Sequence, residues 1–483
     1  MNKPRMIDET MAPSLFDHHL SRRTALSVAA LAAVGFNLPG GIRVAPAADR
    51  SDAGTISNVL KRDQIGATVA RLLAKQPATD LHTHCYSPRF AYSSKPGGLL
   101  LFGIDELLTY HYLVAEVFRV VPPSQLSYEQ FWSMTKPEQA NHIWKNLFVE
   151  RTPLSEACRG VLTTLSRLGL DPNEKDLNRF RKWFAAQKPD AYIDKVMQLA
   201  NVDQITMTNP VFDDVERAMW ERDPDVGGDS RFKPVLRCDQ LLTDWPWVAQ
   251  KLVSWGYRVR VDLGGQTVDE VKRWLGSWLD RMKSAYLAMS LPPDWAYPNA
   301  NNPAADRLTR DCLLPALRER GLSWALMIGV NRGVNPALRD GGDGGGRGDV
   351  QSVANVCRDF PENKFLVTML SQENQHELCV AARKFGNLMI FGCWWFLNNP
   401  SQIEAITRMR IEMLGTTFVA QHSDARILDQ LVYKWEHNRR IIGKVLTEEY
   451  LKLLETGLSL HEHSIRQDVA RLLRENYRNF AGA

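Results

Sequence analysis

From about Asn201 onward, short apolar runs alternate with longer amphipathic segments, and this alternation limits the folds open to the chain more than any other feature. Strands that alternate with helices of this length form β/α units and a parallel sheet. With one earlier run near residue 80 there are eight candidate strands, which predicts an α/β fold, a (β/α)8-like TIM-type barrel. An open doubly wound sheet is the alternative, although no glycine fingerprint follows an early strand. The later runs are Asp203–Thr208, Phe232–Arg237, Ala285–Ser290, Ser323–Gly329, Lys364–Leu370, Leu388–Phe396 and Thr417–His422.

The earliest run reads TDLHTHC from Thr79 to Cys85 and carries two histidines one residue apart. On a strand, residues i and i+2 face the same side, so His82 and His84 would present both imidazoles to one point. On a helix the same spacing would not bring the rings together. A proline-containing break before the run and Ser87-Pro88 after it favour a strand. The alternative is a pair of surface or core histidines without a ligand.

In a barrel of this type, the chemistry lies at the carboxyl ends of the strands. Arg237 ends one predicted strand, and the last run continues into Asp424 and Arg426. The first and last strands of a closed barrel are neighbours, so we expect Asp424 beside His82 and His84. Two imidazoles and one carboxylate suit zinc or another divalent transition metal, with positions left open for substrate. Asp424 could instead cap the following helix.

The segment between Gly103 and about Pro189 looks helical and contains no strong strand. It predicts a helical insertion, about residues 100–195, after the first strand. Within it, Leu154–Leu168 and Leu177–Ala186 are expected to be helices, and Thr152-Pro153 has the pattern of an N-cap followed by proline. The glycine-rich run Gly341–Gly348 lacks the lysine and hydroxyl residue of a P-loop, which favours a mobile loop at the barrel mouth over a phosphate cradle.

Residues 1–47 have the pattern of a twin-arginine export segment. Arg22-Arg23 precedes a short apolar stretch, and Ala45-Pro46-Ala47 offers a cleavage site. The stretch is too short to span a bilayer. We therefore expect residues 48–483 to form the mature barrel domain and to be periplasmic or secreted. Seven scattered cysteines indicate neither a disulfide framework nor a thiolate metal cluster.

The net charge of +4 is small for 483 residues, and no basic run is interleaved with aromatic residues. This excludes nucleic acid as an expected partner. We expect a small-molecule substrate and no stable membrane anchor, and self-association into a homo-oligomer stays open.

Several segments together resemble one family. The H-x-H of the first predicted strand resembles that of the amidohydrolase superfamily, and the chain as a whole, from about residue 60 to 475, resembles the uronate (glucuronate) isomerases. The matching segments follow the family's order: Asp80–His84, Tyr110–Tyr112, Phe391–Phe396, His422–Arg426 and Tyr433–Arg440.

This resemblance implies one divalent metal ion, zinc first with manganese or iron as alternatives, held by His82, His84 and Asp424. It implies ring opening of a hexuronate such as glucuronate or galacturonate, followed by aldose–ketose isomerisation through proton transfer between C2 and C1. Asp424 would be the base, and Tyr112 or His111 would handle the hydroxyl proton. A planar guanidinium suits a substrate carboxylate. Expected substrate contacts are Arg237, Arg426, Trp394 and Trp395, the two tryptophans having core packing as their alternative.

The chain departs from the family's pattern around the pocket. Met327 stands where a histidine is usual, the segment Ser290–Trp295 replaces an S-D-H sequence, and Leu397 follows the aromatic triplet where an asparagine is usual. The substrate therefore stays open among uronates and modified sugar acids. One alternative is a hydrolase or lyase of the amidohydrolase superfamily with a metal-activated water. Another is a non-catalytic binding protein on the same barrel.

Overall fold

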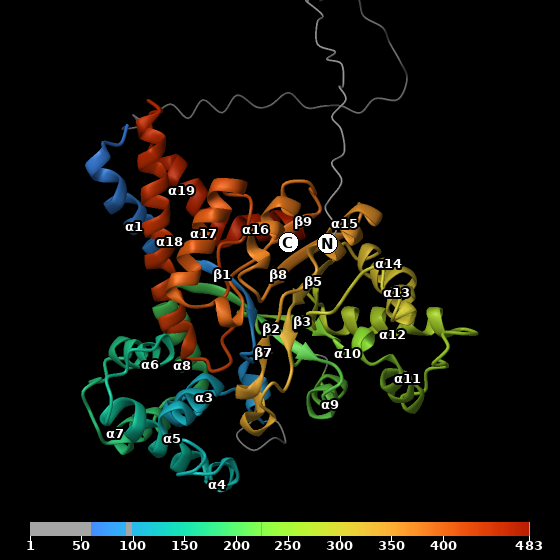
Figure 1. Cartoon of the computed structure of the whole chain (residues 1–483), viewed down its shortest axis with the longest axis horizontal. Helices are drawn as coiled ribbons and strands as arrows, with labels where there is room; N and C mark the ends of the chain where they lie inside the picture. Colours follow the sequence, from blue (N-terminus) through green and yellow to red (C-terminus); the bar gives the residue numbers. More distant parts are fainter. Residues whose placement is uncertain (1–58, 93–98, 224, 483) are drawn as a thin grey trace, which may run out of the picture. The chain divides into compact units, whose positions relative to one another are not determined.

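The structure, a computed structural model, describes residues 59–92, 99–223 and 225–482. The predicted export segment, residues 1–47, lies outside the described residues. Seven strands form one parallel sheet whose spatial order follows the chain (Figure 1). They are β1 (Ala78–Thr83), β2 (Val202–Pro210), β3 (Phe232–Arg237), β4 (Leu287–Leu291), β5 (Ser323–Ile328), β8 (Lys364–Met369) and β9 (Leu388–Ile390). The predicted α/β, TIM-type fold is confirmed.

The predicted eighth strand, Thr417–His422, is wrong as a regular strand. Val419 of this segment makes a single parallel bridge to Phe391, and Ala425, three residues after the segment, makes one to Thr83. These bridges join the β9 edge of the sheet to the β1 edge and close it. The ladder is interrupted at Ser423, whose backbone N–H donates to the side chain of Asp80 at 3.0 Å rather than to a backbone carbonyl of β1.

The strand predicted at Leu388–Phe396 is also shorter than expected. β9 ends at Ile390, and Gly392 and Trp395 then adopt positive φ angles of 62° and 46°. Left-handed backbone does not fit a β-strand, so the chain leaves the sheet at this point. Trp394 and Trp395 therefore lie beyond the strand, at the start of a short 3-10 helix, Trp395–Leu397.

Helices cover the outside of the sheet. The longest is α18 (Gln430–Glu455), which contacts α1 (Ile65–Lys75) although the two are far apart in sequence (Figure 1). It buries Leu431, Trp435, Asn438 and Ile442, which lie three or four residues apart on one face. The other helices after β2 are α9 (Asp214–Arg222), α10 (Gln240–Thr243), α11 (Trp245–Ser254), α12 (Thr267–Met282), α13 (Pro303–Leu308), α14 (Leu314–Arg318), α15 (Val350–Asp359), α16 (Asn374–Ala382), α17 (Pro400–Leu414), α19 (Glu462–Ala470) and α20 (Asn476–Ala481).

Between β1 and β2, where the insertion is predicted, the described residues form helices joined by loops, and these helices gather on one side of the sheet (Figure 1). One predicted start is wrong: α6 begins at Glu156, and Ser155 rather than Thr152 is its N-cap, accepting from the N–H of Cys158. The Ser155 hydroxyl also bonds Glu116 at 2.7 Å, which fixes this later start. The helices are α2 (Ile104–Leu108), α3 (His111–Val120), α4 (Tyr128–Ser133), α5 (Lys136–Trp144), α6 (Glu156–Arg167), α7 (Leu177–Ala185) and α8 (Pro189–Ala200).

The glycine-rich run takes part in a small hairpin. β6 (Val330–Asn331) pairs antiparallel with β7 (Gly344–Gly345), and the hairpin follows directly on β5. Its closed end carries Asp340 and Asp343, which line the cavity described below. The glycines predicted to form a loop therefore include a short paired strand.

Candidate active site

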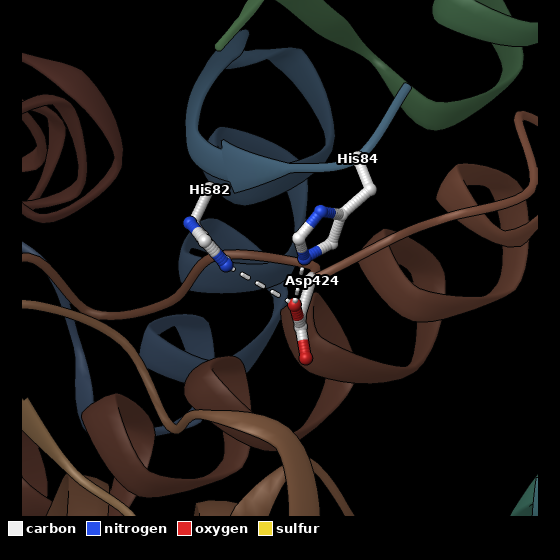
Figure 2. A group of neighbouring side chains, drawn as sticks. All are labelled: His82, His84 and Asp424. Atoms are coloured by element: carbon white, nitrogen blue, oxygen red, sulfur yellow. Dashed lines mark ion pairs between the residues drawn. The ribbon is translucent and has the colours of Figure 1, made fainter. Parts of the chain in front are cut away.

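His82, His84 and Asp424 converge at the point where the sheet closes (Figure 2). His82 lies on β1 and His84 directly after it, whereas Asp424 comes from residues 417–425, the closing segment, which bridges to Phe391 and Thr83. The two Nε2 atoms lie 3.3 Å and 3.6 Å from the same oxygen, Oδ1 of Asp424. The i, i+2 spacing on a strand thus brings both rings to one carboxylate, as the sequence predicts.

The spacing of these atoms fits a divalent metal. The three candidate ligand atoms lie within 4.8 Å of one another. Two ligands that each lie about 2.1 Å from a tetrahedral ion are about 3.4 Å apart, close to the observed nitrogen–oxygen distances. Zinc accepts this mixture of imidazole nitrogen and carboxylate oxygen. Three protein ligands would leave a fourth position for substrate.

The protonation of this group also suits a metal. Burial lowers the pKa of His84 to about 4, which keeps its imidazole neutral, the form that binds a metal. Burial by itself would raise the pKa of Asp424, but hydrogen bonds from His82 and His84 hold that pKa well below its usual range. Asp424 is therefore a carboxylate, and its φ of 52° is one that aspartate tolerates better than most residues. Its backbone N–H donates to the carbonyl of His82 at 2.9 Å.

Asp80, which was not predicted from the sequence as a site residue, holds the segment that carries Asp424 against β1. Its carboxylate is fully buried and accepts from the N–H of Ser423 at 3.0 Å and from the indole Nε1 of Trp435 at 2.7 Å. One side chain thus joins β1, the closing segment and α18. The sequence contained a pattern that could have identified Asp80, because Asp80 precedes His82 by two residues and belongs to the same face of the strand. Lys434 adds a further bond, from Nζ to the carbonyl of Ser423 at 2.6 Å.

A cavity of 530 Å³ opens over the three ligands. Its walls come from the loops after β1, β2, β3 and β9, from the insertion and from the β6–β7 hairpin. The lining contains both predicted arginines and several groups outside the prediction. The polar and aromatic lining residues are His82, His84, Tyr86, Tyr110, His111, Lys136, Thr208, Asp213, Glu216, Arg237, Ser290, Arg332, Asp340, Asp343, Trp394, Trp395, Asp424 and Arg426.

The two predicted arginines differ in how they are held. Arg237 is largely buried and binds Asp239 through two nitrogens, the shorter contact being 2.6 Å. Asp239 also accepts from the N–H of Ser290 at 2.9 Å, so this pair is anchored to β4. Arg426 is half exposed and bonds Asp340 of the hairpin at 2.6 Å. Both guanidinium groups thus reach the cavity, and both are paired within the chain.

The remaining predicted site residues fall into two groups. His111 lines the cavity, its ring nitrogens have no hydrogen-bond partner among the described residues, and burial lowers its pKa to about 4. Trp394 and Trp395 line the cavity too, and the Trp395 ring lies 5.7 Å from that of His111. Tyr112 does not line it among the described residues, whereas Tyr110 does. The hydroxyl of Tyr112 is buried without a bonding partner in that part of the chain.

Two residues next to the site have roles that the sequence did not indicate. Met327, where the resemblance described above implies a histidine, belongs to the same buried apolar cluster as Trp394. His422 is fully buried, and its ring lies 5.4 Å from that of His82. Gly392 makes room for it, because a Cβ at this glycine would lie 2.0 Å from the His422 ring.

A second buried carboxylate, Glu216 on α9, also lines the cavity. It accepts from the hydroxyl of Tyr86 at 2.8 Å and from the amide of Asn209 at 2.6 Å. Burial raises the pKa of Glu216 to about 8 despite these bonds. At neutral pH the cavity lining therefore includes both an ionised acid, Asp424, and a protonated acid, Glu216.

Glu216→Gln should change how stability depends on pH. Between the ordinary pKa near 4.5 and about 8, the folded protein holds a proton on Glu216 that the unfolded chain releases, so stability falls as pH rises through this window. Urea unfolding measures the free energy of unfolding at pH 5.5 and at pH 8.5. The decrease between these two pH values should be larger in the parent protein than in the variant by at least about 1 kcal/mol. Equal losses in both proteins would show that Glu216 ionises normally.

Comparison with solved structures gives clear relatives. A uronate isomerase from Bacillus halodurans is 48% identical, with a TM-score of 0.83, covering 88% of this chain and 98% of that one. A glucuronate isomerase from Caulobacter crescentus (15% identity, TM-score 0.68, 89% and 97% covered) and a uronate isomerase from Thermotoga maritima (15%, 0.68, 87% and 98%) share the fold. Neither the protein-family models nor the curated proteins that were compared gave a match.

Proposed function

The chain belongs to the uronate isomerase family, and we propose that it interconverts the aldose and ketose forms of a hexuronate such as glucuronate or galacturonate. The observation that carries this proposal is the position of Asp424 beside two imidazoles at the base of a cavity whose lining includes Arg237 and Arg426. An ionised carboxylate can take a proton, and a guanidinium can hold the substrate's carboxylate.

In the proposed reaction, Asp424 takes the proton from C2 of the open-chain aldose while the aldehyde oxygen gains a proton. The resulting enediol then receives the proton from Asp424 at C1, and the C2 hydroxyl loses its own proton to leave the ketone. Both imidazoles contact Oδ1 of Asp424, and Figure 2 shows the other carboxylate oxygen pointing away from them. That second oxygen is the one we assign to the C2 proton. Of the two residues predicted to move the hydroxyl proton, His111 lines the cavity and Tyr112 is not among the described lining residues. We therefore assign this step to His111, whose burial supports a neutral imidazole that can accept the proton.

We propose zinc as the metal, held by His82, His84 and Asp424, because two imidazoles and one carboxylate at these distances suit it. A divalent ion at this position would polarise the sugar oxygens during enolisation. Trp394 and Trp395 would pack against the sugar, and Arg237 and Arg426 would contact its polar groups.

We also propose that the protein is exported by the twin-arginine route and acts in the periplasm or outside the cell. The Arg22-Arg23 pair and the cleavage site before residue 48 support this location. All seven cysteines are unpaired and buried, which suits folding in a reducing compartment before export.

Metal analysis and an NMR assay of C2 proton exchange in D₂O test the proposed reaction. We expect about one divalent ion per chain, loss of the C2 proton signal from glucuronate or galacturonate, and ketose formation. His82→Ala should lose both the metal and the exchange. Bound metal with neither C2 exchange nor ketose formation on either sugar would refute the substrate class, and unchanged turnover in His82→Ala would refute the site.

A further inference from the structure

The cations that line the cavity are all paired with carboxylates of the same chain. Within the described residues there are four such pairs. When an anionic substrate binds, each cation either keeps its carboxylate partner or exchanges it for the substrate. They are Arg237–Asp239, Arg332–Asp343, Lys136–Glu106 and Arg426–Asp340.

Only one of these pairs combines two largely exposed side chains. Arg426 and Asp340 are 47% and 66% exposed, against 19% and 16% for Arg237 and Asp239. An exposed ion pair is weak because water solvates both charges well when they separate. A buried pair with two parallel bonds is much harder to break. Arg426 is therefore the guanidinium that can change partner when a substrate arrives.

The loop that carries Asp340 is held in its present position from outside the barrel. Trp132 of α4 donates from Nε1 to the carbonyl of Ala337 at 2.8 Å, and the Arg339 guanidinium lies 4.2 Å from the Trp132 ring. Arg339 has a φ of 54° and a ψ of −129°, a conformation that only glycine adopts readily. The insertion thus holds a strained residue directly before Asp340, and the Asp340 carboxylate faces the cavity as a result.

We propose that Asp340 is a specificity-determining residue, an internal competitor that occupies on Arg426 the place taken by the substrate's carboxylate. This inference rests on the proposed function of the site. A carboxylate on a guanidinium is the same chemical pair whether the acid comes from the hairpin or from a hexuronate. A simple anion that displaces Asp340 from Arg426 gains only one exposed contact in return. A sugar acid also makes contacts at the base of the cavity, and these offset the loss of the ion pair between Asp340 and Arg426.

Asp340→Asn should therefore bind glucuronate about fivefold more tightly than the parent protein, because Arg426 no longer has to be released first. Calorimetric titration of the metal-loaded protein measures this directly, and KM should fall by the same factor at unchanged kcat. Glucose, which has no carboxylate, should bind equally to both proteins.

Asp343→Asn is the matched control. Asp343 lines the same cavity and has the same charge, but it pairs with Arg332. If Asp340 acted only by adding negative charge near the substrate, both variants would tighten binding equally, and the proposal would be wrong. The proposal also requires that Asp340→Asn has no effect when Arg426→Gln is already present. An equal effect in that background would overturn it.

These titrations separate the failure of this inference from the failure of the proposed function. If no hexuronate undergoes C2 exchange but Asp340→Asn still binds glucuronate more tightly, the isomerase proposal fails and the competitor role stands. If the parent protein isomerises glucuronate and Asp340→Asn leaves both its affinity and its KM unchanged, the competitor role fails alone.

Discussion

Asp424→Asn should lose at least about a thousandfold in kcat/KM, because the substitution removes a metal ligand and the proposed base together. Asparagine has the same size as aspartate and tolerates the φ of 52° that position 424 requires, so the fold should survive. Metal content should fall well below that of the parent protein, and C2 exchange should be undetectable on the timescale of the parent.

Asp280→Asn is a suitable control, since Asp280 forms an exposed pair with Arg320 outside the residues that line the cavity. It should keep both metal and turnover. Refilling the Asp424→Asn protein with excess zinc separates the two roles: a loaded but inactive protein supports the base, whereas recovered activity would leave Asp424 as a ligand only. A variant that holds metal and turns over like the parent would refute both roles.

Asp80→Leu should destabilise the protein by about 3 kcal/mol and greatly weaken metal binding. The substitution keeps the approximate size of the side chain but removes every acceptor, which leaves the Ser423 N–H and the Trp435 indole N–H without their buried partners. Each orphaned donor costs about 1–3 kcal/mol. Because Ser423 directly precedes Asp424, we expect the carboxylate to lose its position beside the imidazoles. Urea unfolding and zinc titration measure the two effects.

Two further variants distinguish a positioning role from general destabilisation. Asp80→Asn keeps one acceptor oxygen for Ser423 and should recover most of the metal affinity. Trp435→Phe removes the indole bond and part of a buried ring but keeps the bond from Ser423 to Asp80, so it should lower stability while leaving zinc affinity close to that of the parent. If all three variants lose metal in proportion to their loss of stability, Asp80 has no specific role at the site.

The barrel could be predicted from the sequence because each buried strand is a short apolar run bounded by polar residues and turns. The strand predictions were less accurate where the chain leaves the hydrogen-bonded ladder of the sheet. Nothing in the run Leu388–Phe396 shows that Gly392 and Trp395 turn left-handed, and the segment Thr417–His422 has the composition of a strand without its full ladder. These choices depend on partners from distant parts of the chain.

The same reasoning separates the site residues that could be found from those that could not. His82 and His84 follow from strand alternation, and Asp424 from the closure of a barrel, so the sequence placed all three at one point. Glu216 and Asp340 look like ordinary acids at a helix start and in a loop. Their importance comes from burial against Tyr86 and from pairing with Arg426, and both contacts exist only in the folded protein.

The closing segment between β9 and β1 has an evolutionary consequence. A regular ladder joins backbone to backbone and is nearly indifferent to sequence, but this junction also relies on side chains, such as Asp80 on Ser423 and Asn398 on the Ser423 carbonyl at 2.9 Å. Point substitutions can therefore shift the carboxylate at position 424 without disturbing the other strands. Mutations at the place where the barrel closes can therefore change the chemistry of the site during evolution while the rest of the fold stays the same.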